Sequence, residues 1–182
     1  MIVLDSTTLT LLIEPSAKPP KDPSTGKPLE KCKERIEHLI ETLTGTGSRV
    51  LLPTPILAEL LVRAGAARNQ YLTELTTNYA FRPASFDERA AVELSTIIDA
   101  DLSSKKKLTE YQTWAKVKFD RQIVAIAKIH SVTMIYTDDV SLAKCAKANN
   151  LDVTHTWNLP LPPVKAQQEL DLTAPLDEGA QR

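Results

Sequence analysis

The stretch IYTDD, residues 135–139, is an unusual ending for a hydrophobic run in this 182-residue chain. It closes the apolar run VTMIY, which has the composition of a strand buried on both faces, with two adjacent carboxylates. One carboxylate is explained as the cap of a following helix, whereas a second one beside it requires another reason. The chain opens in the same way, because IVLD at residues 2–5 is a short apolar run that ends in Asp5.

Short apolar runs alternate with amphipathic helical patterns along the chain. Most of the runs are too short or too uniformly apolar for half-exposed hairpin strands, so we expect parallel strands. The expected strands are residues 2–5, 49–52, 79–81, 132–136 and 151–157, and the expected helices are residues 29–43, 55–67, 68–78, 86–102, 109–130 and 140–149. This order predicts an α/β protein, a three-layer α/β/α sandwich around a mainly parallel five-stranded sheet.

Two segments do not fit the pattern of the domain, which is expected to span residues 1–157. Residues 15–28 hold five prolines and are interpreted as a surface excursion. Residues 158–182 begin with NLPLPP, lack periodicity and are interpreted as an extended C-terminal tail.

Composition sets limits on the function. The net charge of −1 provides no general attraction for nucleic acid or membrane, so an anionic partner needs a local basic patch. Cys32 and Cys145 are far apart and lack the spacing of a metal site, so we expect reduced thiols and a cytoplasmic location. No apolar stretch reaches membrane-spanning length, and no membrane partner is expected.

Acidic residues are expected to converge at one edge of the sheet. Ligands of parallel α/β sheets collect at the carboxyl ends of the strands. Asp5 ends the first strand, and Asp138 and Asp139 end the fourth. Asp120 lies in the helix that leads to the fourth strand, and Glu59 lies in the second turn of an earlier helix. Four acids that are distant in sequence are therefore predicted to meet.

Each acid also has an ordinary structural explanation. Asp5 alone is explained as a cap of the next turn, and Asp120 as part of a solvated helix face. Of Asp138 and Asp139, one is expected to cap the helix and the other to join the site. Glu59 is the only charge in PILAELLV, so we expect it to be at least partly buried.

The start of the helix that carries Glu59 is also predicted. Thr54 is expected to be its N-cap, and Pro55 its first helical residue. This places Glu59 near the same edge of the sheet as the other acids.

Repulsion among the acids determines what the cluster needs. Two carboxylates about 4 Å apart repel by about 4 kcal/mol at an effective dielectric constant of about 20. Either some carboxylates are protonated or a cation lies among them. His38, His130 and His155 are not expected near the acids, so the ligands are all oxygen atoms, which favour Mg²⁺ or Mn²⁺.

Four segments resemble, in order, the motifs of the PIN-domain ribonuclease family, which includes VapC-like toxins. The segments are MIVLDSTTL, TPILAELL, KFDRQIVAIA and IYTDDVSLAKCA, and the likeness covers residues 1–157. The resemblance implies a sheet of order 3-2-1-4-5 and a metal-dependent endoribonuclease that uses Mg²⁺ or Mn²⁺ to cleave RNA phosphodiester bonds. The additional segments 15–28 and 158–182 are departures from the shorter toxin members of the family.

The resemblance also assigns roles to residues. Catalytic and metal-binding roles fall on Asp5, Glu59, Asp120 and Asp139, and Asp138 is a further candidate metal ligand. Ser6 and Thr137 match small hydroxyl residues that support the metal, whereas Thr7 replaces the asparagine of many members.

Candidate partners are RNA, an antitoxin and a second copy of the chain. Basic residues near the motifs are candidate RNA contacts, namely Lys116, Lys118, Arg121 and Lys144. The chain is interpreted as a ribonuclease of this family, with a toxin–antitoxin pair as one setting. The alternative is a catalytically weak PIN-fold binding module in a protein or RNA assembly.

Overall fold

The computed structural model describes residues 1–14, 16–103 and 114–163. The strands are β1 (Ile2–Leu4), β2 (Val50–Pro53), β3 (Phe81–Ala84), β4 (Met134–Tyr136) and β5 (Asp152–Thr154). The helices are α1 (Ser6–Ile13), α2 (Cys32–Gly45), α3 (Thr54–Ala64), α4 (Arg68–Thr77), α5 (Glu88–Ser103), α6 (Trp114–Ile129) and α7 (Val140–Ala148), with short 3-10 turns η1 (Gly65–Ala67) and η2 (Thr156–Asn158).

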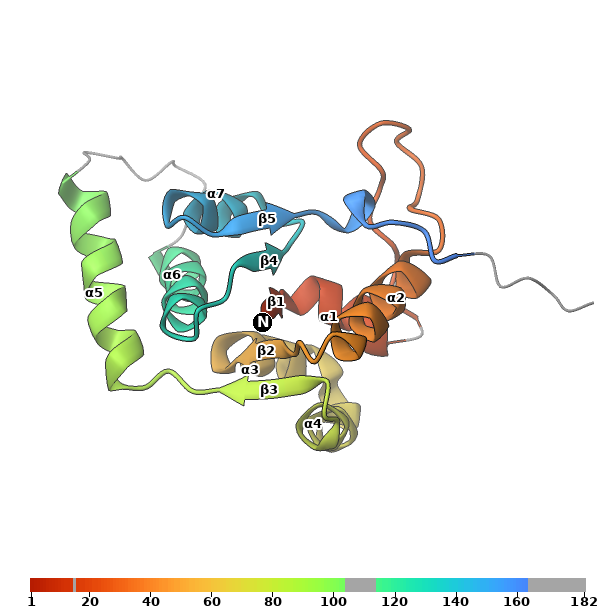
Figure 1. Cartoon of the computed structure of the whole chain (residues 1–182), viewed down its shortest axis with the longest axis horizontal. Helices are drawn as coiled ribbons and strands as arrows, with labels where there is room; N and C mark the ends of the chain where they lie inside the picture. The colour runs from red at the N-terminus through yellow and green to blue at the C-terminus, as the bar shows by residue number, and fades with distance from the viewer. Residues whose placement is uncertain (15, 104–113, 164–182) are drawn as a thin grey trace, which may run out of the picture.

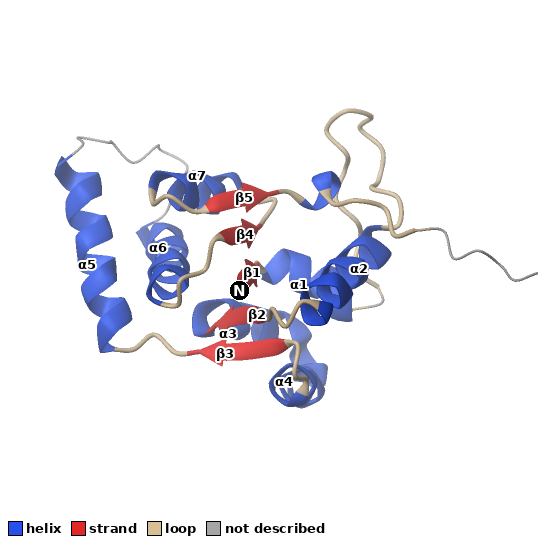
Figure 2. Ribbon diagram, in the orientation of Figure 1, coloured by secondary structure: helices blue, strands red, loops and turns tan. Residues whose placement is uncertain are grey.

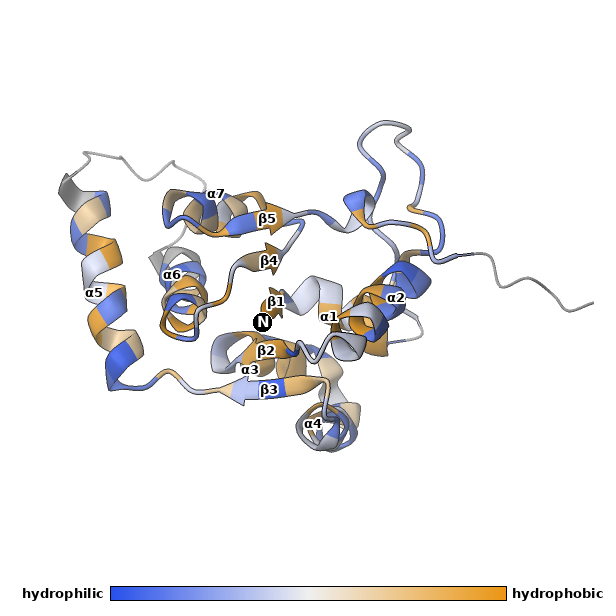
Figure 3. Ribbon diagram, viewed as in Figure 1, coloured by the Kyte–Doolittle hydropathy of each residue, from blue (hydrophilic) through white to orange (hydrophobic). Residues whose placement is uncertain are grey.

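The five strands form one sheet in the order β3-β2-β1-β4-β5, and every neighbouring pair is parallel (Figure 1). Helices cover both sides of the sheet (Figure 2). The predicted α/β/α sandwich and its strand order are therefore confirmed. The central strands are strongly hydrophobic (Figure 3), and Val3, Leu51 and Ile135 have no exposed surface, as expected for strands buried on both faces.

One helix was missed by the sequence analysis. α1 has the sequence STTLTLLI, whose three threonines have poor helix propensity. It forms because Asp5 caps it, accepting a hydrogen bond of 2.7 Å from the backbone N–H of Thr8, and because Leu9 and Leu11 are buried in the core.

The predicted cap of α3 is wrong. Thr54 is the first helical residue, and its hydroxyl oxygen accepts a hydrogen bond from the backbone N–H of Phe86 at 3.2 Å instead of capping the helix. The helix starts directly after β2 because Pro53 and Pro55 restrict the backbone on either side of Thr54. The expected position of Glu59, at the carboxyl edge of the sheet, is unaffected.

The helices form two contacting groups. α1 contacts α2 and α3, whereas α6 contacts α5 and α7 (Figure 1). The groups meet where α3 lies against α6. None of the helices in the described ranges is both long and apolar enough to cross a membrane.

The two segments set apart in the sequence have different surroundings. Residues 16–31 form a loop that projects from the domain (Figure 1), closed by a bridge between Lys21 and Pro28. Near the start of the expected tail, Leu159 is buried, and its carbonyl oxygen accepts a hydrogen bond from the Arg35 guanidinium. The chain therefore remains packed on α2 beyond residue 157, and residues 164–182 lie outside the described part.

Candidate functional site

A cavity of about 560 Å³ lies between α3 and α6, at the carboxyl ends of β1 and β4. Its floor and walls combine acids with apolar side chains. The lining residues are Asp5, Ser6, Thr7, Ala58, Glu59, Val62, Arg63, Phe119, Asp120, Ile123, Asp139 and Leu142. The four acids that were expected to be catalytic therefore lie around one cavity.

Asp5 is buried at the floor of this cavity. Its two carboxylate oxygens accept hydrogen bonds from the Thr8 N–H and from the Thr137 hydroxyl. Burial raises the pKa of Asp5 above its usual value, and these hydrogen bonds counteract the rise. The nearby negative charge of Asp138 raises this pKa further. The hydrogen bonds therefore offset only part of the cost of charging the Asp5 carboxylate.

Asp139 and Asp120 are tied to the same helix. Asp139 caps α7, with one carboxylate oxygen accepting from the backbone N–H groups of Ser141 and Leu142 at 2.7 and 3.2 Å. The Ser141 hydroxyl donates to Asp120 at 2.6 Å, and Asp120 is buried in α6. Thr137 completes this network, because its hydroxyl oxygen accepts from the Asp139 N–H at 3.0 Å while it donates to Asp5.

Glu59 differs from these acids because 43% of its side chain is exposed. Glu59 is therefore partly buried, as expected from its apolar neighbours, and its carboxylate stays accessible to solvent. One of its oxygens accepts from the Ser6 hydroxyl at 2.8 Å, and the other lies 2.6 Å from Nη2 of Arg63. An exposed ion pair between residues four apart on a helix contributes only about 0.3–0.5 kcal/mol to stability.

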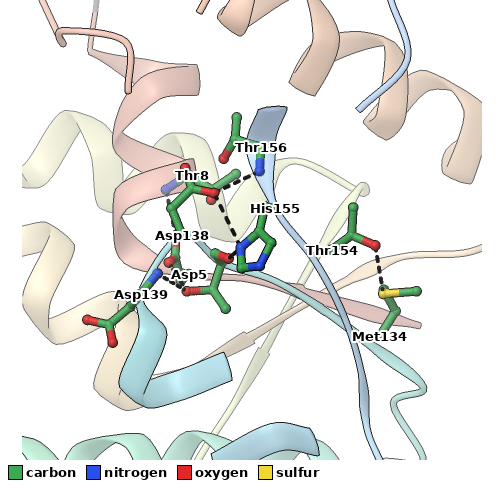
Figure 4. Close-up of polar contacts among 9 residues, drawn as sticks. Asp5, Thr8, Met134, Asp138, Asp139, Thr154, His155 and Thr156 are labelled. Carbon is green, nitrogen blue, oxygen red and sulfur yellow. Dashed lines mark hydrogen bonds and ion pairs between the residues drawn. The ribbon is translucent and has the colours of Figure 1, made fainter. Parts of the chain in front are cut away.

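Asp138 lies outside the cavity, although the sequence made it a candidate metal ligand. Figure 4 shows the side chains of Asp138 and Asp139 pointing away from each other. Asp138 accepts from the backbone N–H of Thr156 at 2.8 Å and lies 3.9 Å from Nδ1 of His155, which stacks on Trp157. His155 therefore lies beside Asp138 and is not among the described residues that line the cavity.

The division of roles expected for the aspartate pair is also wrong. A single residue, Asp139, both caps the helix and lines the cavity. Asp138 instead fastens the end of β4 to η2. The second carboxylate is explained by its contact with the C-terminal part of the domain.

The cavity offers the kind of ligand atoms that a hard cation prefers, but its acidic side chains are not grouped around one ion position. The carboxylate and hydroxyl oxygens suit Mg²⁺ or Mn²⁺. Within the described ranges, however, no three acid, histidine or cysteine side chains are grouped closely enough to hold one ion.

Of the four candidate RNA-binding residues, Lys118, Arg121 and Lys144 have described side chains, and none of these three is among the lining residues of the cavity. Lys118 and Lys144 are exposed. Arg121 is largely buried, and its Nε and Nη2 both donate to Oδ2 of Asp101 in α5, which leaves little of it for RNA. The side chain of Lys116 lies outside the described part.

Sequence reasoning missed two residues on the walls. Arg63 and Phe119 both line the cavity, and Phe119 is 46% exposed. The spacing of Arg63 four residues after Glu59 was a usable signal, because oppositely charged residues at this spacing pair on a helix. Phe119 stands directly before Asp120 but gave no signal, since an aromatic residue in a helix is usually part of the core.

Comparison with known structures identifies the fold. The chain is similar to a chain of FitAcB from Neisseria gonorrhoeae, with 22% identity, a TM-score of 0.53, and coverage of 87% of this chain and 100% of that chain. It is also similar to a chain of VapBC2 from Rickettsia felis bound to a promoter DNA fragment, with 12% identity, a TM-score of 0.54, and coverage of 85% and 98%. The chain has a PIN-like fold.

A third similar structure is the DNA-bound VapBC of Salmonella typhimurium, with 14% identity, a TM-score of 0.51, and coverage of 85% of this chain and 97% of that chain. No family model matches the sequence, and no curated protein matches it. At these identities the likeness establishes the fold, and the residues of this chain must carry any argument about activity.

Proposed function

We propose that the chain is a metal-dependent endoribonuclease that cleaves RNA phosphodiester bonds. The observation that carries this proposal is the position of Asp5, Glu59, Asp120 and Asp139 around one cavity of a PIN-like domain. These residues come from four separate segments of the sequence, so a structural role for each one separately does not account for their meeting.

Mg²⁺ or Mn²⁺ would be held by these acids and would polarise the phosphoryl group when bound. Asp139 is positioned by its capping contacts, and Asp120 by the Ser141 hydroxyl. Thr137 orients Asp5 and Asp139 together, and Ser6 orients Glu59. These hydroxyl contacts hold the carboxylates in place before a substrate arrives.

The apolar walls favour a nucleotide over a small phosphate ester. Phe119 and Val62 are large apolar side chains that remain exposed next to the acids, 46% and 74% respectively. An unstacked base gains free energy by stacking on an aromatic ring, with about 1–3 kcal/mol per base. We therefore favour single-stranded RNA, and competition among RNA, DNA and a phosphomonoester tests this choice.

The decisive experiment compares RNA cleavage by the parent chain and by Asp5→Asn and Asp120→Asn, with Mn²⁺ and with EDTA. Each substitution removes a buried carboxylate of the cavity and should lower cleavage by on the order of a hundredfold or more. Asp152→Asn, on the exposed surface of β5, is the control and should retain activity. Cleavage that persists in Asp5→Asn and in EDTA would refute the proposal.

A second candidate function is a PIN-fold binding module without strong catalysis. It is favoured by the observation that the acids of the described ranges are not grouped around one ion position. Calorimetry with Mn²⁺ separates the two, because a catalytic site must bind the ion at millimolar concentration or below.

We also propose a protein partner of the antitoxin type. The support is the likeness to chains of FitAcB and VapBC, whose names each join two components. Size-exclusion chromatography of the chain purified from the cells in which it naturally occurs, with mass spectrometry of the co-eluting proteins, tests this partner. A chain that elutes alone would contradict it.

A further inference from the structure

Arg63 is a basic residue on the wall of a cavity lined by acids. It lies in the last turn of α3, and it is the only lysine or arginine among the described residues that line the cavity. Its Nη2 contacts Glu59 at 2.6 Å, and 47% of its side chain is exposed. Its positive charge therefore lies beside the acid that a cation would need.

The contact between Arg63 and Glu59 is easily broken. Both side chains are about half exposed, and the pair has a single close contact, so solvent screens it strongly. Glu59 would retain its hydrogen bond from Ser6 if Arg63 left. A divalent cation has twice the charge of a guanidinium and prefers carboxylate oxygens, so it competes well for Glu59.

A released Arg63 has a clear alternative ligand. A guanidinium binds phosphate oxygens through two parallel N–H groups, a geometry that lysine lacks. Arg63 is one helical turn from Glu59, it lines the cavity, and its exposed side chain is accessible to a polynucleotide bound there. Phe119 lines the same cavity from α6 and offers a surface for a base.

We propose that Arg63 is the phosphate-binding residue of this site and that it rests on Glu59 until a divalent cation displaces it. The inference rests on the proposed function and names the residue that recognises the substrate backbone. Arg63 then couples the binding of the cation to the binding of RNA, because a cation on Glu59 frees Arg63 for phosphate. By linkage, RNA bound to Arg63 favours the cation to the same extent.

The experiment measures two affinities in Arg63→Gln. Calorimetry with Mn²⁺ alone should show binding roughly three- to tenfold tighter than in the parent chain, because a competing positive charge is gone. Anisotropy with a single-stranded phosphorothioate oligouridylate of about 20 nucleotides should show binding roughly tenfold weaker in Mn²⁺, because a charge-assisted contact is lost. A merely structural role for Arg63 would not move the two affinities in opposite directions.

Two further variants complete the design. Arg68→Gln removes the same charge from the exposed start of α4, outside the cavity, and should leave both affinities within about twofold of the parent. Arg63→Lys retains the charge but not the planar fork, so its Mn²⁺ affinity should stay near that of the parent while RNA binding recovers only in part.

The outcomes distinguish this inference from the proposed function. Mn²⁺ binding that is equal in Arg63→Gln and Arg68→Gln overturns the displacement of Arg63, whether or not the chain cleaves RNA. Unchanged oligouridylate binding in Arg63→Gln overturns its phosphate role. A parent chain that binds Mn²⁺ and RNA with the expected opposite shifts in Arg63→Gln, yet never cleaves, leaves the inference standing and refutes only the nuclease.

Discussion

The floor and the rim of the cavity are built in different ways. At the floor, Asp5 and Thr137 are buried, and Asp139 is fixed by three hydrogen bonds within its own turn. At the rim, Glu59 and Phe119 are nearly half exposed. The difference indicates that the floor fixes where charge is placed, while the rim remains free to adapt to a ligand.

The two regions also differ in their effect on stability. Burial makes the charged form of Asp5 unfavourable, and the Thr137 hydroxyl offsets part of that penalty. The rim pair of Glu59 and Arg63 is screened by solvent and contributes little. Changes at the floor should therefore alter folding, whereas changes at the rim should alter binding.

The largest effect on stability is expected for Thr137→Val. Valine retains the shape of threonine, so no cavity forms, but one oxygen of Asp5 and the N–H of Asp139 lose their partner. Each buried polar group left without a partner costs about 1–3 kcal/mol. We expect a loss of about 2–4 kcal/mol in the free energy of unfolding, measured by urea denaturation at neutral pH without metal.

Thr156→Val is the matched control. Thr156 is as buried as Thr137, but within the described residues its hydroxyl has no hydrogen-bond partner. Its replacement should be neutral or slightly stabilising, because no contact is lost and a buried hydroxyl is removed. Equal losses in the two variants would show that the Thr137 hydroxyl has no special role at the floor.

A smaller effect of opposite sign is expected for Asp5→Asn. Because the folded pKa of Asp5 is raised, its penalty is absent below the unfolded value near 3.9 and grows as the pH rises through the folded value. Above that value the penalty is complete, so the variant should be more stable than the parent at neutral pH. The gain should be on the order of 1 kcal/mol, or about 2–4 °C in Tm.

The pH dependence provides the test of this prediction. Thermal melts without metal should show the two chains converging as the pH falls toward 4, roughly the unfolded pKa of aspartate. Mn²⁺ should raise the Tm of the parent chain more than that of Asp5→Asn, because an ion that binds only the folded state stabilises it. An Asp5→Asn variant that melts lower at neutral pH would show that the carboxylate acts mainly as the cap of α1.

The sequence was sufficient for the sheet because its strands are short, apolar runs whose order limits the topology. It was also sufficient to bring Asp5 and Asp139 to one edge, since Asp5 directly follows β1, Asp139 follows soon after β4, and the two strands pair with each other. It did not reveal α1, because threonine-rich segments form helices only when a cap and core contacts support them.

The sequence alone did not predict the directions in which the side chains point. Asp138 and Asp139 are adjacent, yet a contact with Thr156, 18 residues later, draws only Asp138 away from the cavity. The pairing of Arg121 with Asp101 likewise depends on how α5 packs on α6. Contacts between segments that are distant in sequence decided each of these cases.

The smallest effect on stability, but a clear effect on binding, is expected for Phe119→Ala. The ring is 46% exposed, so its removal should change the free energy of unfolding by less than about 1 kcal/mol. Loss of a stacking surface should weaken the binding of a single-stranded oligouridylate by about fivefold or more, while Phe119→Trp should retain it.

Val92→Ala, which shortens an exposed side chain of α5 outside the cavity, should leave RNA binding unchanged. Anisotropy titrations and thermal melts of the three variants measure both quantities. If Phe119→Ala destabilised the fold as much as Thr137→Val and bound RNA normally, Phe119 would be part of the core and the contrast between floor and rim would fail.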